Sequence, residues 1–280
     1  MRTNTLTFTA VCICTFVIAL SGRCLASDTI RINGSGSALD MLKPLIKAYM
    51  KNNRGVRIEV EKSLGSSGAI KALMAGVLDV AVSSKQLKDE DIAKGAKLKA
   101  YGRTPFAIVT EKSVPKGNIT TSELEDIYTG KTSRWQNGEL IRLVLRPMED
   151  TDTSILRGLS PGMNTSVTAS HSRPGMITAV TDQEAYKTVL KTPGGIGATA
   201  LISIISERLS LKTLSLDGVS PTTKNLASGA YPMYKEINFV ITSRTTPAAL
   251  KFISFAYSPK GRSIAEKAGV LVTAEAKGNK

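Results

Sequence analysis

Cysteine is almost missing from this chain of 280 residues, and its three copies, Cys12, Cys14 and Cys24, all lie near the start. Beyond Cys24 the chain therefore forms no disulfide, no thiolate metal site and no cysteine nucleophile. Its stability must come from the burial of apolar side chains. A length of about 250 residues after the first segment is enough for two modest lobes.

Histidine and aromatic side chains are also scarce. His171 is the single histidine, and aromatic residues make up 5% of the chain. One histidine without cysteine cannot build an ordinary metal site, so we expect no metal and no cofactor. The formal charge is +14, but the lysines are dispersed, without the basic–aromatic interleaving that stacks bases. These features argue against nucleic acid as a partner and indicate a surface that attracts small anions.

Residues 1–26 have the pattern of a secretory signal peptide. Arg2 gives a positive start, residues 10–20 form an apolar run that is short for a membrane span, and Cys24-Leu25-Ala26 resembles a cleavage site. We therefore expect an exported, periplasmic protein that keeps most of its positive charge. An uncleaved anchor and a lipid anchor at Cys24 are the alternatives, although Arg23 fits poorly before a lipidated cysteine.

Strand and helix patterns alternate along the chain. In the first part we predict strands at residues 29–32, 56–60 and 78–83 and helices at residues 39–51, 69–76 and 89–94. This spacing is typical of a mostly parallel sheet with crossover helices. Further on we predict strands at residues 106–110, 141–145 and 239–242, helices starting near residues 121 and 154, a turn at residues 193–197 and a helix at residues 247–257. Thr121 or Ser122 is expected to cap the first of these helices.

Two loops rich in glycine and serine each precede a predicted helix. The first is Asn33-Gly34-Ser35-Gly36-Ser37, and the second is Leu64-Gly65-Ser66-Ser67-Gly68. A helix N-terminus offers free backbone N–H groups and the positive end of the helix dipole. Because glycine and serine let an anion approach these groups closely, the two loops predict an oxyanion site.

Motifs of catalysis are weak in this sequence. Gly130-Lys131-Thr132 has the end of a phosphate-binding P-loop, but Glu125 stands where that loop requires glycine. No Gly-x-Ser-x-Gly elbow surrounds the serines of the two loops. We therefore expect a binding protein rather than an enzyme.

Several segments, in this order and spacing, make the chain resemble the phosphate-binding periplasmic proteins of ABC importers. The resemblance covers most of the sequence after the leader. It rests on the stretches at residues 33–38, 65–71, 79–84, 124–131 with Trp135, 146–154, 194–197 and 228–232. The Asp126-Ile127-Tyr128-x-Gly130-Lys131 segment is the most specific of them, and we interpret it as structural.

The resemblance implies an α/β fold of two lobes, each a mixed, mostly parallel sheet flanked by helices. Two strands that cross between the lobes, near residues 104–108 and 235–240, would form the hinge. The expected division is a signal peptide at residues 1–26, a first lobe at residues 27–104 and 239–280, and a second lobe at residues 105–238. The ligand would be held between the lobes.

The resemblance also implies a set of ligand contacts. In the first lobe these are backbone N–H groups near Ala38 and Leu39, with Ser37 beside them, and the hydroxyl of Ser66. In the second lobe Arg146 matches an arginine that pairs with the anion, because a guanidinium group suits two oxyanion oxygens. Thr151 and Thr153, with the intervening Asp152, match the donors of the next helix start.

Ser84 is the clearest departure from the family pattern. Phosphate binders of this family usually have an aspartate there, which accepts a hydrogen bond from the protonated ligand. Asp150 or Asp152 is a candidate to replace this acceptor from the other lobe, and Asp152 is also a candidate helix cap. Each of these residues also has a purely structural interpretation: serines cap helices, and arginines form salt bridges.

Three functions stay open at this point. The favoured one is a monomeric solute-binding protein that captures a tetrahedral oxyanion, phosphate first, for an ABC permease or a membrane sensor. A second is a hydrolase of phosphate esters with a loop serine or threonine as nucleophile, although no base or metal cluster is evident to activate it. The third keeps the fold but binds another oxyanion or a small organic anion.

Overall fold

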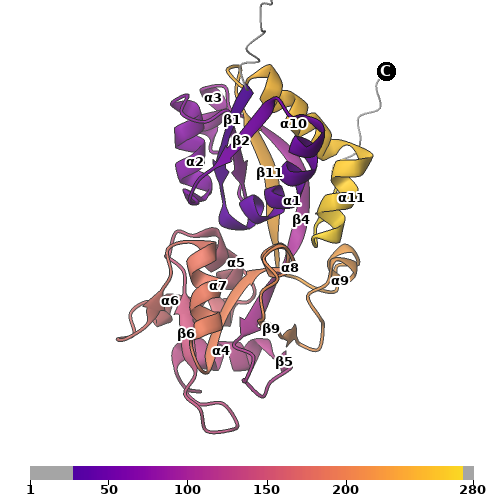
Figure 1. The fold of residues 1–280 in the computed structure, drawn as a ribbon. Coiled ribbons are helices and arrows are strands. Elements are labelled where there is room, and N and C mark those ends of the chain that lie inside the picture. The colour runs from indigo at the N-terminus through magenta and orange to yellow at the C-terminus, as the bar shows by residue number, and fades with distance from the viewer. Residues whose placement is uncertain (1–27, 274–280) are drawn as a thin grey trace, which may run out of the picture.

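The computed structural model describes residues 28–273, which form two lobes joined by a narrow waist (Figure 1). The predicted signal peptide and the candidate lipid anchor at Cys24 lie outside the described residues. Within residues 28–273, every helix is too short or too polar to span a bilayer.

The first lobe is built around three parallel strands in the order β2-β1-β3. Helices cover this sheet because each crossover connection between parallel strands runs over one face. The elements of this part are β1 (Asp28–Gly34), α1 (Gly36–Asn52), β2 (Val56–Val60), α2 (Gly65–Met74), β3 (Val80–Ser83) and α3 (Asp89–Ala93). The end of the chain returns to this lobe as α10 (Pro247–Tyr257), α11 (Pro259–Lys267) and β12 (Leu271–Val272).

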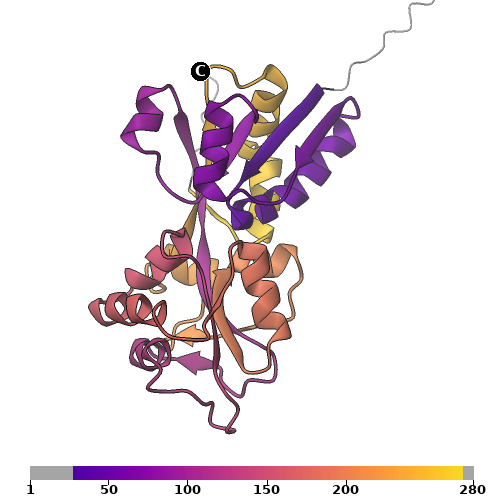
Figure 2. The same cartoon turned by 90° about the vertical axis from the view of Figure 1, so that its left-hand side faces the viewer.

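Two long antiparallel strands form the waist, as Figure 2 shows from the side. β4 (Lys97–Thr110) pairs with β11 (Tyr234–Ile241) from Lys97 to Pro105. From Phe106 onward β4 pairs instead with β8 (Gly195–Ala200) of the second lobe. A register shift in β11 between Ile237 and Asn238 interrupts the ladder near its middle.

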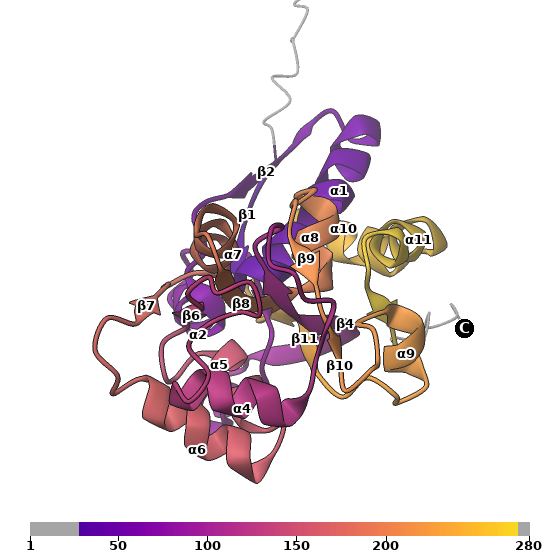
Figure 3. The same ribbon diagram turned by 90° about the horizontal axis from the view of Figure 1, so that it is seen from below.

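The second lobe continues the sheet through β8, β6 and β7, which are parallel to one another. Seen from below, α4, α5 and α6 lie on one side of these strands and α7 on the other (Figure 3). The elements of this part are β5 (Asn118–Ile119), α4 (Thr121–Thr129), β6 (Arg142–Leu145), α5 (Thr151–Arg157), α6 (Pro161–Ser170), β7 (Ile177–Thr178) and α7 (Asp182–Lys191). The chain then returns through α8 (Leu201–Ser206), β9 (Lys212–Thr213), β10 (Ser215–Leu216) and α9 (Thr223–Ala227).

Each lobe has its own hydrophobic core. The first contains Met41, Leu42 and Phe252, and the second contains Phe106, Met163 and Tyr231, all of them fully or almost fully buried. Burial of side chains of this size stabilises each lobe by roughly 1.5–3 kcal/mol per residue relative to exposure. The fold predicted from the sequence, two α/β lobes with crossing strands, is confirmed. The residue boundaries of the predicted lobes stay a prediction. Ile202 belongs to the predicted second lobe by number but packs in the core of the first.

Several local predictions need correction. α1 begins at Gly36 rather than at residue 39, and α2 begins at Gly65 rather than at residue 69. Thr120, rather than Thr121 or Ser122, caps α4: its hydroxyl accepts from the amide of Glu123, whose carboxylate accepts from the amide of Thr120. α5 begins at Thr151 instead of Ser154. The predicted turn at residues 193–197 becomes strand from Gly195 onward. β4 starts nine residues before the predicted residue 106. Its first part was not recognised as strand because half of it faces solvent and carries lysines such as Lys97 and Lys99.

Candidate anion-binding site

A small pocket of about 250 Å³ lies between the two lobes. The first lobe contributes serines at the starts of α1 and α2, the second lobe contributes Arg146 and the start of α7, and the hinge contributes Lys235. Polar and charged side chains that line the pocket include Ser35, Ser63, Ser66, Ser67, Lys85, Arg146, Asp150, Thr151, Thr181, Asp182 and Lys235.

The N-termini of α1, α2 and α7 converge on this pocket, since Ser35, Ser66 and Thr181 all line it. Within residues 28–273, the amides of Gly36, Ser37 and Ala38 donate to no backbone or side-chain acceptor. Free amides at the positive end of a helix dipole are the donors that an oxyanion needs. Of the backbone contacts predicted near Ala38 and Leu39, the amide of Ala38 is free, whereas the amide of Leu39 donates to the carbonyl of Ser35 at 2.9 Å and is not available. Ala38 itself is buried, and the side chain of Leu39 faces a neighbouring cleft.

Four serines link the two loops of the first lobe. The hydroxyl of Ser84 donates to that of Ser35 at 2.8 Å, and Ser35 lies 3.2 Å from the hydroxyl of Ser37. The backbone amide of Ser84 donates to the hydroxyl of Ser66 at 3.0 Å. Three predicted residues, Ser37, Ser66 and Ser84, are therefore together, and Ser35 completes the cluster. Ser35 and Ser66 line the pocket, whereas Ser37 and Ser84 do not, and Ser84 lines a neighbouring cavity.

Arg146 follows the end of β6, and its side chain is only 7% exposed. Its guanidinium donates to the carbonyl of Ala179 at 2.7 Å and to the carboxylate of Asp150 at 2.8 Å. Its Nε atom has no hydrogen-bond partner among the described residues and lies 3.5 Å from Oδ2 of Asp152, on the side away from the pocket. The two terminal nitrogens of the guanidinium each donate one hydrogen bond and each keep a second N–H group. A planar cation with such free N–H groups is suited to bind an anion.

The predicted residues of the α5 start divide into two groups. Thr151 lines the pocket. Asp152 and Thr153 instead line a separate, very small cavity behind Arg146. The hydroxyl of Thr153 donates to the carbonyls of Arg146 and Pro147, at 3.2 and 2.9 Å, so it fixes the loop. Asp150, rather than Asp152, caps α5, because its carboxylate accepts from the amide of Asp152 at 2.9 Å.

A buried cluster of charges surrounds the floor of the pocket. The ammonium group of Lys235 lies 2.5 Å from Oδ1 of Asp152 and 2.6 Å from Oδ1 of Asp182. The contact with Asp152 has the distance of an ion pair, but it lacks the geometry of a hydrogen bond. Together with Arg146 and Asp150, the cluster holds two cations and three carboxylates. Fully ionised, it would carry one excess negative charge.

Burial and the neighbouring charges together explain the acid–base behaviour of the cluster. Burial raises the pKa of Asp152 to about 7, although Lys235 opposes the change. Burial also acts on Asp182, but Lys235 and then Arg146 outweigh it and lower its pKa to about 2. The pKa of Lys235 is raised because its two carboxylates outweigh the cost of burial. Asp152 is thus the carboxyl group that holds a proton near neutral pH.

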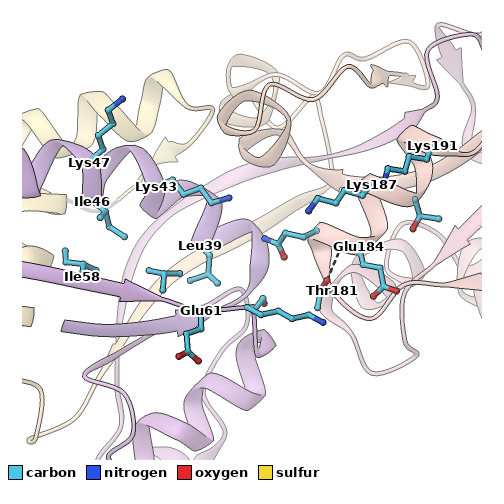
Figure 4. A pocket seen from close by; sticks show the side chains of 15 residues that line it. Leu39, Lys43, Ile46, Lys47, Ile58, Glu61, Thr181, Glu184, Lys187 and Lys191 are labelled. Carbon is cyan, nitrogen blue, oxygen red and sulfur yellow. Dashed lines mark hydrogen bonds between the residues drawn. The ribbon is translucent and has the colours of Figure 1, made fainter. Parts of the chain in front are cut away.

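A larger cleft of about 940 Å³ opens beside the pocket, between α1, β2 and α7 (Figure 4). The two share Ser63 and Thr181 in their linings, so the cleft is continuous with the pocket. Lys43 on α1 and Lys187 on α7 point toward each other from opposite lobes. Lysines around this opening favour the approach of a small anion.

His171 is a packed residue. One ring nitrogen lies 2.9 Å from the carbonyl of Val167 and the other 2.8 Å from the carbonyl of Arg146. Both nitrogens are therefore engaged with the backbone. No group of three or more histidine, cysteine or acidic residues within residues 28–273 has the arrangement of a metal site.

A comparison with known protein families decides the family. The family described as "PBP superfamily domain" matches residues 23–260. The chain belongs to the PBP superfamily.

Individual relatives of this superfamily member carry phosphate in their names. The phosphate-binding protein PstS of Borreliella burgdorferi is 25% identical over 250 residues, which is 86% of this chain and 89% of the relative. The PstS protein of Bacillus subtilis is 26% identical over 243 residues, covering 82% and 75% of the two chains.

Solved structures support the fold. A Clostridium perfringens protein described as a candidate phosphate ABC transporter substrate-binding protein, crystallised with phosphate, has a TM-score of 0.74 and 22% identity. That comparison covers 88% of this chain and all of the other. An ABC-type phosphate transport receptor from Vibrio cholerae, at 20% identity and a TM-score of 0.59, covers 87% and 99%.

Ser35, Asp182 and Lys235 line the pocket but were not predicted from the sequence as site residues. Ser35 stands inside the first Gly-Ser loop, so the loop itself was the signal. Lys235 was assigned to a crossing strand, and a lysine beside the apolar run Ile237, Phe239, Val240 could have marked it as unusual. Asp182 follows Thr181 in the ordinary pattern of a helix start, and nothing local distinguishes it.

Proposed function

We propose that this chain is an exported solute-binding protein that captures phosphate between its lobes and presents it to an ABC permease or a membrane sensor. The observation that carries the proposal is the convergence of three helix N-termini and Arg146 on one interlobe pocket of about 250 Å³. The names of the relatives point to the same ligand. On this proposal the protein is periplasmic and monomeric, residues 1–26 are its signal peptide, and it performs no catalysis.

The pocket also has features that favour a protonated anion. Asp150 and Asp182 line it, beside the donors of α1 and α2. A carboxylate repels a fully ionised sulfate, whereas it can accept a hydrogen bond from an anion that keeps a proton. Phosphate keeps one proton at neutral pH and sulfate keeps none. The proposed ligand order is therefore phosphate before sulfate, with Asp150 in the place of the acceptor that Ser84 lacks.

Calorimetric titration with phosphate and with sulfate, in a buffer free of both, tests the proposal. We expect saturable binding of phosphate and at least tenfold weaker binding of sulfate. Absence of phosphate binding would refute the proposal, and equal affinity would refute the argument from the carboxylates. Turnover of a generic phosphomonoester in the same sample would support the hydrolase alternative instead.

A further inference from the structure

Lys235 is a cation that the hinge places at the ligand pocket. It is the second residue of β11, it is 2% exposed, and its side chain lines the pocket. Burial of a lysine is costly unless carboxylates compensate the charge, and a buried ion pair often stabilises a protein no more than apolar side chains of similar size. The position therefore has a purpose other than stability.

The side chain of Asp182 lies against Gly36 at the start of α1. A Cβ atom added to Gly36 would lie 2.6 Å from Oδ2 of Asp182 and 2.7 Å from its Cβ, so the two backbones approach closely only because residue 36 is glycine. Gly36 opens α1, a helix of 17 residues with free amides at its start. The carboxylate of Asp182 thus lies beside the same helix end that the proposed ligand would use.

Lys235 therefore serves Asp182 in the way it would serve a bound anion. Oδ1 of Asp182 accepts from Lys235 at 2.6 Å, and Oδ2 lies against the first turn of α1. The neighbouring Gln183 donates to the carbonyl of Gly36 at 3.1 Å, which holds α7 of the second lobe against α1 of the first. Movement of the lobes would change the position of Asp182 relative to Lys235.

We propose that Lys235 binds the anion, an inference that rests on the proposed function. In the absence of ligand, Asp182 is the counter-ion of Lys235. When the anion binds, the ammonium group leaves Asp182 and donates to an oxygen of the anion. Asp182 then competes with the ligand. Its removal strengthens binding, whereas removal of Lys235 weakens it.

The other charged groups around the lysine fit this exchange. Asp152 remains beside Lys235, with Asp150 and Arg146 next to it, and Tyr128 of α4 also faces Asp152. Because burial raises the pKa of Asp152 to about 7, this carboxyl group can take up a proton when an anion adds negative charge to the cluster. The cluster can therefore accept a ligand without a large excess of charge.

Two variants separate this role from a structural one. Asp182→Asn removes the competing charge, and we expect about tenfold tighter phosphate binding, since like charges placed side by side are strongly unfavourable. Lys235→Met with Asp182→Asn removes one cation and one carboxylate, so the net charge of the cluster is unchanged. We expect the double variant to bind phosphate about 30-fold more weakly than the native protein. Lys251→Met, an exposed lysine of α10 that lies away from the pocket and the cleft, is the matched control.

Calorimetry with inorganic phosphate, after circular dichroism has verified folding, decides between the outcomes. Native affinity in the double variant, or unchanged or weaker binding in Asp182→Asn, would overturn the role of Lys235 while the proposed function stands. If the double variant does not fold, Asp182→Asn alone decides. A native protein that binds no phosphate would instead refute the proposed function.

Discussion

Replacement of Arg146 by alanine should lower the stability of the protein and, on the proposed function, its affinity for phosphate. The guanidinium makes two buried hydrogen bonds, to Asp150 at 2.8 Å and to Ala179 at 2.7 Å, and lies 3.5 Å from Asp152. Removal of one partner of a buried ion pair typically costs about 3–5 kcal/mol, because the other charge stays buried. In a domain of this size that loss lowers the melting temperature by about 10 °C.

The loss of affinity should be large as well. Truncation of a buried charged partner costs about 2–5 kcal/mol of binding free energy, or about 30-fold or more in the dissociation constant. Phosphate calorimetry at 15 °C, well below the lowered melting temperature, measures this change on folded protein.

Arg142→Ala is the matched control for this prediction. Arg142 begins the same strand, is exposed, and donates to the carbonyl of Pro193 at 2.8 Å. It should change affinity by less than about twofold, as is typical of surface positions. Equal phosphate affinities in the two variants would remove Arg146 from the site.

Three further predictions concern pH and the movement of the lobes. Because the pKa of Asp152 is raised to about 7, its contribution to stability is complete below about pH 4 and is lost as pH rises to 7. The free energy of unfolding, measured by urea titration, should therefore fall more between pH 5 and pH 7.5 in the native protein than in Asp152→Asn, by up to about 1.4 kcal/mol per pH unit; an equal change in the two proteins would contradict the assignment. Gly36→Ala should weaken phosphate binding about tenfold, because its Cβ would meet Asp182 and Gln183 at 2.5–2.7 Å, whereas Gly55→Ala, with no atom within 4 Å, should not. Small-angle scattering should give a smaller radius of gyration with saturating phosphate, and an unchanged radius would argue against ligand-driven closure.

Local signals allowed much of the fold to be predicted. The predicted strand at residues 56–60 and the helix at residues 247–257 coincide with β2 and α10. In α10, Thr246 caps the helix and Pro247 occupies its first turn, and both signals are contained in adjacent residues. The two Gly-Ser loops were informative for the same reason, since a helix start depends on its own sequence.

The charged floor of the site could not be predicted in this way. Lys235 and Asp182 are 53 residues apart, and they meet only because the chain crosses between the lobes twice. Asp150 and Asp152 look equivalent in the sequence, yet one caps α5 beside the pocket while the other is buried behind Arg146. Which carboxyl group keeps its charge depends on burial and on distances to Lys235, and neither is encoded locally.

The exchange of partners along β4 has a consequence for how the protein unfolds. Residues 97–105 pair with β11 and residues 106–110 pair with β8, without an interruption in the strand. If the ladder between β4 and β11 is lost, the unpaired backbone belongs to the same strand that pairs with β8, and the reverse also holds. The two ladders of β4 should therefore open as one cooperative unit. Amide hydrogens on both sides of Pro105 should therefore exchange with deuterium at a common free energy. A cut inside β4 would leave neither half with a complete sheet.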